Sequence, residues 1–460
     1  MSVSSVTPRL DSVPASEWSY DQAAHLLRRA CFGGTPAEID EAARLGSQEA
    51  VERVLRGTLG LERRRREGVG SGKDPSEEDW EAEDGVARLR AWWVERLGRP
   101  AHPAHEKMVL FWHGHFTTSA RKVRSARMLW RQQEVFREQA FGNFESLVQA
   151  MVEDPAMVRF LDAESGSRAA PNENLARELM ELFTLGEGNF TEEDVAELAR
   201  ALTGLRIEDA DGRRPRVVEA ADARDRDSKV ILGRRGRFHR PSRFVRLLVG
   251  RPQCAPFLCR RIWDFYAGGE PEAGVIEGLA EVLRRSRFEL RPVLAVLWAS
   301  QAFHAAPRRR AMIKSPVQWY AQAVHTLECG RPPSAWAVGV LRELGQELFE
   351  PPNVGGWPGD RAWITTRRLT DRYRFAGELV ERMGRGDPGM WARLLPMEAR
   401  EDLPTASRRL CMRLFQDPMT RRYREILLEY HHRAGGASAG DEAVAATVRF
   451  LMATPEYQIC

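Results

Sequence analysis

The amino-acid sequence predicts a mainly α-helical protein with one integrated multi-helical core, long irregular loops and at most a short β hairpin. Three observations support this fold class. Apolar residues recur three and four positions apart through most of the 460 residues, which is the period of a helix with one buried face. Capping residues precede such stretches, and glycines follow them. Alternating strand patterns are scarce, and the best β candidate is "KVILG" at 229–233.

An N-terminal helical segment, residues 1–58, is the first predicted unit. Its apolar stripe in "DQAAHLLRRACFGG" stops at a Gly-Gly pair. A second helix then opens at Thr35, which suits an N-cap, with Pro36 at the first helical position. Residues 59–84 carry many charges and glycines and few apolar residues. This composition predicts a charged, flexible linker or loop.

Residues 85–375 form the predicted helical core, and residues 376–460 are expected to add C-terminal helices that pack on it. The segment "NFTEEDVAELARALTG" shows the helical pattern plainly, because Thr191 suits the N-cap and Gly204 follows the last turn. Residues 206–242 differ, since they are polar and rich in arginine and glycine. They predict an irregular region around the strand candidate.

Composition and charge exclude several classes of protein. The chain has 43% hydrophobic and 29% charged residues, as ordinary globular proteins have. Its 69 basic and 65 acidic residues leave a net charge of +4, which does not indicate a nucleic-acid partner. We find no secretory signal and no apolar run near the roughly 20 residues of a membrane span, so the predicted location is cytoplasmic. Six scattered cysteines predict reduced structural thiols.

Several catalytic signatures are missing from the sequence. It contains no G-x-S-x-G elbow, no phosphate-binding G-x-x-x-x-G-K-[ST] loop, no G-x-G-x-x-G turn and no H-E-x-x-H helix. A conventional serine hydrolase, nucleotide-binding domain or zinc protease is therefore not expected.

The segment "FWHGHFTTS", residues 111–119, is the first candidate for chemistry. His113 and His115 lie two positions apart, which is about 200° around a helix, so they share a face only if the helix ends between them. Gly114 makes such an end plausible. With that end, the two histidines could bind a metal or transfer protons. The alternative is that one histidine caps the helix and the other packs in the core.

A second candidate is the helix in "PNENLARELMELFTLGEGN", residues 171–189. Asn172 suits its N-cap, and Glu173 is favourable in its first turn. One hypothesis is that Asn174, Arg177 and Glu178 line a cavity, where a carboxylate beside an arginine could be a general base or a metal ligand. The alternative is an ion-paired ladder on the surface, with a structural role only.

Two irregular stretches supply further polar candidates. In "DARDRDSKVILG", Lys229 with the nearby aspartates Asp225 and Asp227 could hold an anion or a metal, although a solvated charged loop also explains them. In "GQELFEPPNVGGWPGDRAWITTRR", Trp357 and Trp363 predict a rigid loop that is packed against the core. The polar candidates of this loop are Asn353, Asp360 and Arg361.

Taken together, these motifs resemble a known family, catalogued as domain of unknown function 1800. The resemblance runs in order through "AAHLLRRACFGGT", "EKMVLFWHGHFTTS", "DPAMVRFLD", "PNENLARELMELFTLGEGNFTEEDVAELARALTG", "KVILG", "IKSPVQW" and "GQELFEPPNVGGWPGDRAWIT". It implies a mainly helical fold and no established reaction. The positions that match the family's motifs are His113, His115, Asn172, Glu173, Asn174, Arg177, Glu178, Lys229, Lys314 and Ser315.

The resemblance also implies a cellular context. Members are often exported, and often encoded beside a protein similar to the alkaline phosphatase and sulfatase superfamily, which implies such a protein as a partner. This sequence departs from the family in lacking a visible export signal. It also carries Arg224 and Asp225 where the family has a histidine and an aspartate ahead of the lysine at Lys229.

The leading hypothesis from the sequence is a hydrolase or group transferase that acts on a polar or anionic substrate. The catalytic candidates are His113, His115, Glu173, Asn174, Arg177 and Glu178. The substrate-binding candidates are Asn172, Lys229, Lys314, Ser315, Asn353 and Trp357. A divalent metal is a candidate cofactor. The alternatives are a non-catalytic scaffold or assembly partner, in which these residues form a buried network, and phosphoryl transfer through Lys229 and the nearby aspartates.

Overall fold

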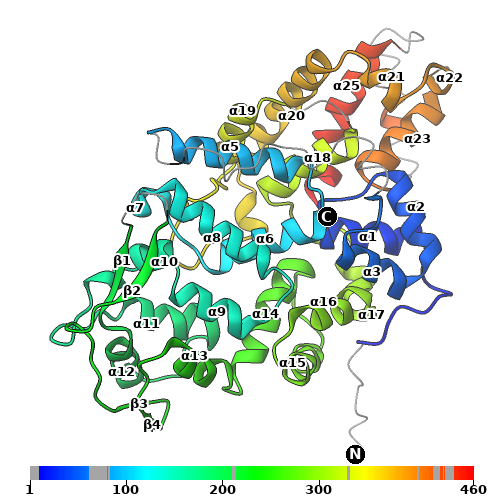
Figure 1. The fold of residues 1–460 in the computed structure, drawn as a ribbon. Helices are drawn as coiled ribbons and strands as arrows, with labels where there is room; N and C mark the ends of the chain where they lie inside the picture. The colour runs from blue at the N-terminus through cyan, green and yellow to red at the C-terminus, as the bar shows by residue number, and fades with distance from the viewer. Residues whose placement is uncertain are drawn as a thin grey trace, which may run out of the picture.

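The structure, a computed structural model, describes residues 10–61, 80, 83–209, 214–328, 332–400, 403–417, 425–427, 429 and 440–460. Helices dominate these residues, and two small antiparallel sheets of two strands each accompany them (Figure 1). The mainly α fold class is confirmed, with two short hairpins where the sequence predicts one at most. Most of the predicted charged linker, residues 62–79 and 81–82, lies outside the described residues.

Three helices begin the chain: α1 (Tyr20–Ala30), α2 (Pro36–Leu45) and α3 (Ser47–Arg56). The predicted start of α2 is confirmed. Thr35 is its N-cap, and the Thr35 hydroxyl accepts a hydrogen bond from the Glu38 N–H while the Glu38 carboxylate accepts one from the Thr35 N–H. This reciprocal capping box satisfies two backbone donors that the first turn of a helix leaves free.

Most of the remaining helices form the body of the molecule. The segment up to the hairpins contains α5 (Gly85–Gly98), α6 (Pro103–His115), α7 (Ala120–Val123), α8 (Ala126–Glu138), α9 (Phe144–Val152), α10 (Pro155–Phe160), η2 (Ala163–Ser165), α11 (Asn174–Glu178), η3 (Leu179–Thr184) and α12 (Glu192–Leu202). The segment after them contains α13 (Pro241–Val249), α14 (Cys254–Tyr266), α15 (Val275–Arg285), α16 (Leu290–Ala299), α17 (Gln301–His304), η4 (Ala306–Arg308), α18 (Pro316–Leu327), α19 (Ser334–Glu343) and η5 (Asp360–Trp363). The C-terminal part contains α20 (Thr366–Gly386), α21 (Met390–Leu394), α22 (Met397–Arg400), α23 (Leu403–Leu414), α25 (Asp441–Met452) and η6 (Pro455–Gln458), with α20 to α25 gathered at one end of the molecule (Figure 1).

The two hairpins lie at the opposite end from these C-terminal helices (Figure 1). In the first, β1 (Leu205–Glu208) pairs with β2 (Arg216–Glu219), and Leu205 is opposite Glu219. In the second, β3 (Lys229–Ile231) pairs with β4 (Arg234–Gly236), and Lys229 is opposite Gly236. The strand predicted in "KVILG" is therefore confirmed as β3.

Helix α6 is buried along almost its whole length, including two charged side chains. Glu106 accepts hydrogen bonds from the side chains of Trp93, Arg96 and Arg137, at 2.7 to 2.8 Å. Lys107 donates to the carbonyl oxygens of Arg28 and Cys31 and to Gln318, so it joins α6 to the C-terminal end of α1 and to α18. A cation suits that end of α1, where the last carbonyl groups carry partial negative charge.

The loop of residues 344–365 packs against the C-terminal end of α6. The Thr117 hydroxyl donates to the carbonyl of Val354 at 2.5 Å, and the carbonyl of Phe349 accepts from the Ala120 N–H at 2.7 Å. Gly356 makes the closest approach, because a Cβ atom at this position would lie 2.4 Å from the backbone oxygen of Gly114. Its φ of +84° is also a conformation that favours glycine.

We expect Gly356→Ala to lower the free energy of unfolding by about 2 to 3 kcal/mol, since the new methyl group meets backbone and the φ is unfavourable. Gly114→Ala is the matched control on the other side of the same contact. A Cβ atom at Gly114 meets nothing within 4 Å. Alanine there should therefore leave the free energy of unfolding unchanged or raise it by about 0.5 to 1 kcal/mol. Urea denaturation of both variants measures the difference. Equal effects of the two changes would contradict the packing of the loop on α6.

Candidate functional site

A cavity of about 710 Å³ lies along one face of α6. The α6 residues that line it are Lys107, Leu110, Phe111, Gly114 and His115. Their spacing of three and four places all of them on one side of the helix. The other walls come from α14, from the segments 307–315 and 357–363, from Arg29 of α1 and from Cys460. The cavity therefore joins segments that are far apart in the sequence.

Cationic side chains outnumber carboxylates around the cavity. The cations are Arg29, Lys107, Arg260, Arg261, Arg308 and Arg361, and the carboxylates are Asp264 and Asp360. Three of the cations are held by hydrogen bonds: Arg260 pairs with Asp264 and Glu270, Arg308 donates to the carbonyls of Gly268 and Glu270, and Lys107 uses all three of its donors. An excess of positive charge remains, and it favours an anionic ligand.

Arg29 is the most deeply buried of these arginines, at 1% exposure. Its Nη2 donates to the carbonyl of Arg308 at 2.8 Å, whereas Nε and Nη1 have no hydrogen-bond partner. Burial lowers the pKa of Arg29, and Cys460 and Asp360 are the opposing charges nearby. Buried donors without partners are costly, so two of them on a cavity wall mark a place where a ligand acceptor would be stabilised.

His115 also lines this cavity, and one of its ring nitrogens has no hydrogen-bond partner. Its Nε2 lies 3.1 Å from the carbonyl oxygen of Phe183. A carbonyl can only accept, so Nε2 carries the proton and Nδ1 is left as a free acceptor in the neutral ring. Nδ1 has no hydrogen-bond partner, and His115 is 2% exposed. Burial first, and then the charge of Arg261, lower the pKa of His115 to about 3.

His113 lies in a different environment. Its Nε2 accepts from the Phe349 N–H at 3.0 Å, and its Nδ1 lies 3.0 Å from the side-chain amide of Gln133. Trp93 packs edge-on against the ring, at 4.8 Å between centroids. Both ring nitrogens are engaged, and burial lowers the pKa of His113 to about 3. The arrangement is that of a packed core histidine that fixes the loop at Phe349.

The structure does not bring His113 and His115 together. The sequence predicts a helix end at Gly114 that would let the two rings converge. Instead α6 continues through Gly114 to His115, so the rings point about 200° apart around the helix. Glycine is tolerated inside a helix whose other residues are fixed by burial, and tertiary packing therefore overrides its tendency to end α6.

The polar residues of the 171–189 helix lie at the surface and not on the α6 cavity. The N-cap of α11 is Glu173, one residue after the predicted Asn172, and Asn172 instead accepts a hydrogen bond at its Oδ1 from the Asn174 N–H at 2.9 Å. Arg177 forms a bidentate pair with Glu192 and a further contact of 3.3 Å with Glu173. This is the surface ladder that the sequence leaves open as an alternative to a cavity.

Glu178, like Arg177 and Glu181, is partly buried. Burial raises the pKa of the Glu178 carboxyl, and the charge of Glu181 raises it further, whereas Arg177 lowers it. The helix then changes to π-helical geometry in η3, and this turn ends beside α6. Phe183 of η3 supplies the carbonyl that fixes His115. The 171–189 helix thus contributes to the cavity through its backbone, which residue types in the sequence cannot reveal.

Lys229 is enclosed by its own loop. Its Nζ donates to the carbonyl oxygens of Asp225 and Asp227 at 2.9 Å and to the Asp225 carboxylate at 3.1 Å. Asp225 also pairs with Arg200, and Arg224 donates to the carbonyl of Thr203. All three donor positions of the lysine are occupied, so the arrangement fixes the loop before β3.

The remaining candidates lie on or near the cavity. Ser315 and Trp357 line it, as do Asp360 and Arg361. Lys314 is 1% exposed, and its Nζ lies 3.8 Å from the centre of the Tyr457 ring. Asn353 is exposed in the loop, where its backbone carbonyl accepts from the Gly356 N–H.

No three His, Cys, Asp or Glu side chains gather closely enough to hold a metal ion in the part of the chain that the structure describes. His115 offers one nitrogen, and the cavity carboxylates are Asp264, which pairs with Arg260, and Asp360, which accepts from the Ile313 N–H. These residues do not fit a divalent metal, which needs several oxygen or nitrogen ligands around one point.

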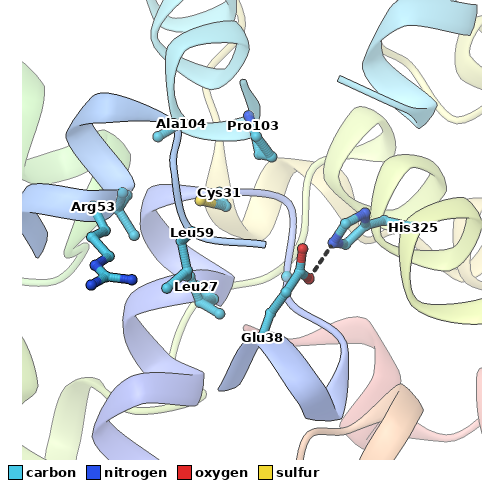
Figure 2. Close-up of a pocket in the computed structure, with 11 residues that line it drawn as sticks. Leu27, Cys31, Glu38, Arg53, Leu59, Pro103, Ala104 and His325 are labelled. Atoms are coloured by element: carbon cyan, nitrogen blue, oxygen red, sulfur yellow. Dashed lines mark hydrogen bonds and ion pairs between the residues drawn. The ribbon is translucent and has the colours of Figure 1, made fainter. Parts of the chain in front are cut away.

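A second pocket, of only about 20 Å³, lies between α1, α2, α3 and the start of α6. Figure 2 shows Glu38 and His325 pointing toward each other across its edge, with 2.9 Å between Oε2 and Nε2. This volume holds about one water molecule. The pair therefore joins α2 to α18 and does not form a ligand site.

Except for Arg361, the arginines of the cavity are what sequence reasoning misses. Arg28 and Arg29 lie in the buried helix α1, and both are less than 5% exposed. An Arg-Arg pair inside an apolar helical stripe is the available signal, because buried arginines need partners. Arg261 has no such signal, since it is one of many arginines in the sequence and only the packing of α14 beside α6 places it near His115.

Comparison with known proteins gives a family and no further relative. No helix among the described residues is long and apolar enough to cross a membrane. No curated protein and no solved structure matches the chain. A family model, described as "Protein of unknown function (DUF1800)", matches residues 25–459. That match covers nearly the whole chain, from α1 to the last residues beside the cavity, and the protein belongs to the DUF1800 family.

Proposed function

We propose that the protein is a hydrolase or group transferase that acts on a small anionic substrate in the cavity along α6. The observation that carries this proposal is the presence of unpartnered groups of complementary chemistry on one cavity: the Nε and Nη1 donors of Arg29 and the Nδ1 acceptor of His115. Perturbed titratable groups in a large concave pocket are typical of reaction centres.

In this proposal the arginines bind and His115 moves a proton. Arg29 and Arg261 hold the anionic part of the substrate. The Nδ1 atom of His115 accepts a proton from water, or from an alcohol in group transfer, as its oxygen attacks the acyl or phosphoryl centre. The protonated ring then returns the proton to the leaving oxygen as the substrate bond breaks. The Phe183 carbonyl keeps the ring in the required tautomer and orientation.

The low pKa of His115 in the free protein fits this role only if the substrate changes it. Burial and the charge of Arg261 lower that pKa, and no other charged side chain contributes to the shift. An anion bound beside Arg261 opposes its charge and so removes that part of the shift, although burial, the larger cause, still lowers the pKa of His115. Substrate binding thereby makes His115 a stronger base than it is in the free protein.

The scaffold hypothesis stays a prediction, together with its proposed partner similar to the alkaline phosphatase and sulfatase superfamily. A scaffold is expected to have a large exposed apolar patch and no concave polar cavity. The exposed large hydrophobic residues among those described are Val230, Tyr373 and Ile426, which belong to separate elements. The polar cavity therefore supports the enzyme proposal over the scaffold.

Turnover of chromogenic anionic esters tests the proposed function. The probes are 4-nitrophenyl phosphate, 4-nitrophenyl sulfate and the 4-nitrophenyl monoester of succinate. We expect the full-length protein to hydrolyse at least one of them, and His115→Gln to lower that rate by about 100-fold or more. Glutamine keeps a donor for the Phe183 carbonyl and removes the Nδ1 acceptor, so the thermal midpoint should change little.

Two controls make the result specific. His325→Gln changes a histidine outside the cavity and should leave the rate unchanged. The pH profile of the wild-type rate should follow a single basic group that is absent from His115→Gln. Equal rates for wild type and His115→Gln, or no turnover of any of the three probes, would overturn the proposal.

A further inference from the structure

The cavity is elongated along α6. Its α6 wall runs from Lys107 to His115, eight residues, which corresponds to a length of about 12 Å along the helix axis. Helix α14 forms a second wall that runs in the opposite direction: Phe265 contacts Phe111 at 5.3 Å between ring centres, and Phe257, two turns earlier in α14, contacts His115 at 6.4 Å. The ends of the cavity can therefore be assigned to different residues.

Arg29 marks the end of the cavity at Lys107. Lys107 donates to the carbonyl oxygens of Arg28 and Cys31, which lie one residue before and two residues after Arg29 in the chain. All three donor positions of Lys107 are used, so Arg29 supplies the free donors at this end. The opposing charges near it are Cys460 and Asp360. The Cys460 side chain also forms a hydrogen bond with the Arg29 guanidinium, whereas Nε and Nη1 have no hydrogen-bond partner.

Arg261 marks the end of the cavity at His115. It is exposed to solvent and lies one turn before Phe265 in α14. Its neighbour Arg260 pairs with Asp264 and Glu270, so these carboxylates are already engaged. His115 and Arg261 both line the cavity, the charge of Arg261 lowers the pKa of His115, and the Nδ1 atom of His115 has no hydrogen-bond partner. This end thus combines a cation with a neutral proton acceptor.

Between the two ends the α6 wall is apolar, and apolar residues from two other segments lie opposite it. Leu110 and Phe111 of α6 face Phe265 of α14, and Met312 lies across from Gly268 at the end of α14. No charged α6 residue lines the stretch between Lys107 and His115. An apolar segment that is long enough to bridge the ends would be buried here, with a gain of about 25 cal/mol per Å² of apolar surface.

We propose that the ligand of this cavity is an elongated dianion, with one anionic group at Arg29, a second at Arg261 and an apolar segment between them. This inference rests on the proposed function, because it specifies the class of substrate for the same site. An α,ω-dicarboxylate is the simplest molecule with this chemistry, and a cavity wall of about 12 Å on α6 gives the scale of its length.

Isothermal titration calorimetry with octanedioate and octanoate tests the inference on the full-length protein. We expect octanedioate to bind at least about tenfold more tightly than octanoate, since only the dianion satisfies both arginines. Hexanedioate and dodecanedioate should bind more weakly than the best member of the series, because one is too short to reach both ends and the other must fold.

Variants at the two ends give the sharper signature. Arg261→Gln should lower the affinity for octanedioate to that for octanoate, and should change octanoate binding by about twofold or less because a monoanion can turn round. Arg29→Gln should act in the same way, and Arg29→Lys should give an affinity for octanedioate between those of Arg29→Gln and the wild type. Thermal melting of both variants checks that the protein is folded. Arg285→Gln, which changes an exposed arginine paired with Glu281 outside the cavity, is the matched control.

The outcomes separate this inference from the proposed function. Equal binding of octanoate and octanedioate, lowered equally by Arg261→Gln, would show a single anion subsite and overturn the dianion while the proposed function stands. Octanedioate binding that neither arginine variant changes would place the ligand elsewhere and overturn the inference. Turnover of the chromogenic esters without any binding of either carboxylate would also overturn it, whereas failure of both experiments would overturn both proposals.

Discussion

Glu106→Gln is expected to lower the free energy of unfolding by about 3 to 5 kcal/mol, because it removes the charge that two arginines share inside the core. Glu106 is 2% exposed and accepts from Arg96 and Arg137, and Arg137 is itself 8% exposed. In the variant, one glutamine hydrogen atom faces an arginine donor. The buried guanidinium of Arg137 then keeps only Glu134, whose side chain is 38% exposed, as a counter-charge, and this is the main source of the loss.

The pH dependence of stability identifies the same interaction. Burial alone would raise the pKa of Glu106, but the charges of Arg137 and Arg96 and their hydrogen bonds lower it from 4.5 to about 2. A depressed pKa stabilises the fold above pH 4.5, and this contribution, about 3 kcal/mol, is lost as the pH falls from about 4.5 toward 2. Urea denaturation at several pH values should show that loss in the wild type and not in Glu106→Gln.

The exposed pair of Glu281 and Arg285 provides the control for Glu106. Glu281→Gln should change the free energy of unfolding by about 0.5 kcal/mol or less, since surface ion pairs contribute little. A similarly small effect of Glu106→Gln would contradict the described contacts around α6.

Asp154→Asn is expected to act in the opposite direction and to stabilise the protein above neutral pH. Burial raises the pKa of Asp154 from 3.8 to about 7, although hydrogen bonds from the Met157 N–H and Gln132 oppose the shift. Both bonds go to Oδ1, at 2.8 and 2.7 Å, so an asparagine oxygen can accept them. The variant keeps the cap of α10 and removes a buried charge.

The sign of this effect follows from linkage. A raised pKa means that the fold prefers the protonated carboxyl, so stability is present below pH 3.8 and is lost as the pH rises from 3.8 to about 7. Asp154→Asn should match the wild type near pH 3 and exceed it at pH 8 by up to about 4 kcal/mol. Asp162→Asn, at an exposed ion pair with Lys122, should show no such crossover. A destabilised Asp154→Asn protein at pH 8 would show that the carboxylate is needed in its charged form.

Much of the fold follows from local sequence signals. Thr35, Thr191 and Asn143 cap helices as residues of their types do, and the strand at "KVILG" pairs as β3. These features depend on neighbours within a few positions, which a single sequence displays. The continuation of α6 through Gly114 does not follow in this way, because it depends on packing against distant segments.

The candidate site follows from the sequence only in part. His115 is conspicuous because it lies in an apolar helix, and Trp357 is conspicuous in its loop, and both line the cavity. Glu173 and Arg177 are residue types that also suit catalysis or anion binding, yet they form an ion pair at the surface. The difference is set by which face of each helix meets the rest of the protein. Arg29 and Arg261 line the same cavity only because α1 and α14 pack beside α6.

The most direct test of the central claim is a crystal structure of the protein with octanedioate at a concentration that saturates binding in calorimetry. Our account predicts density in the cavity along α6, with one carboxylate about 2.7 to 3.2 Å from Arg29 Nε or Nη1 and the other at Arg261 beside His115 Nδ1. An empty cavity with the ligand bound at another surface would contradict the assignment of this cavity as the functional site.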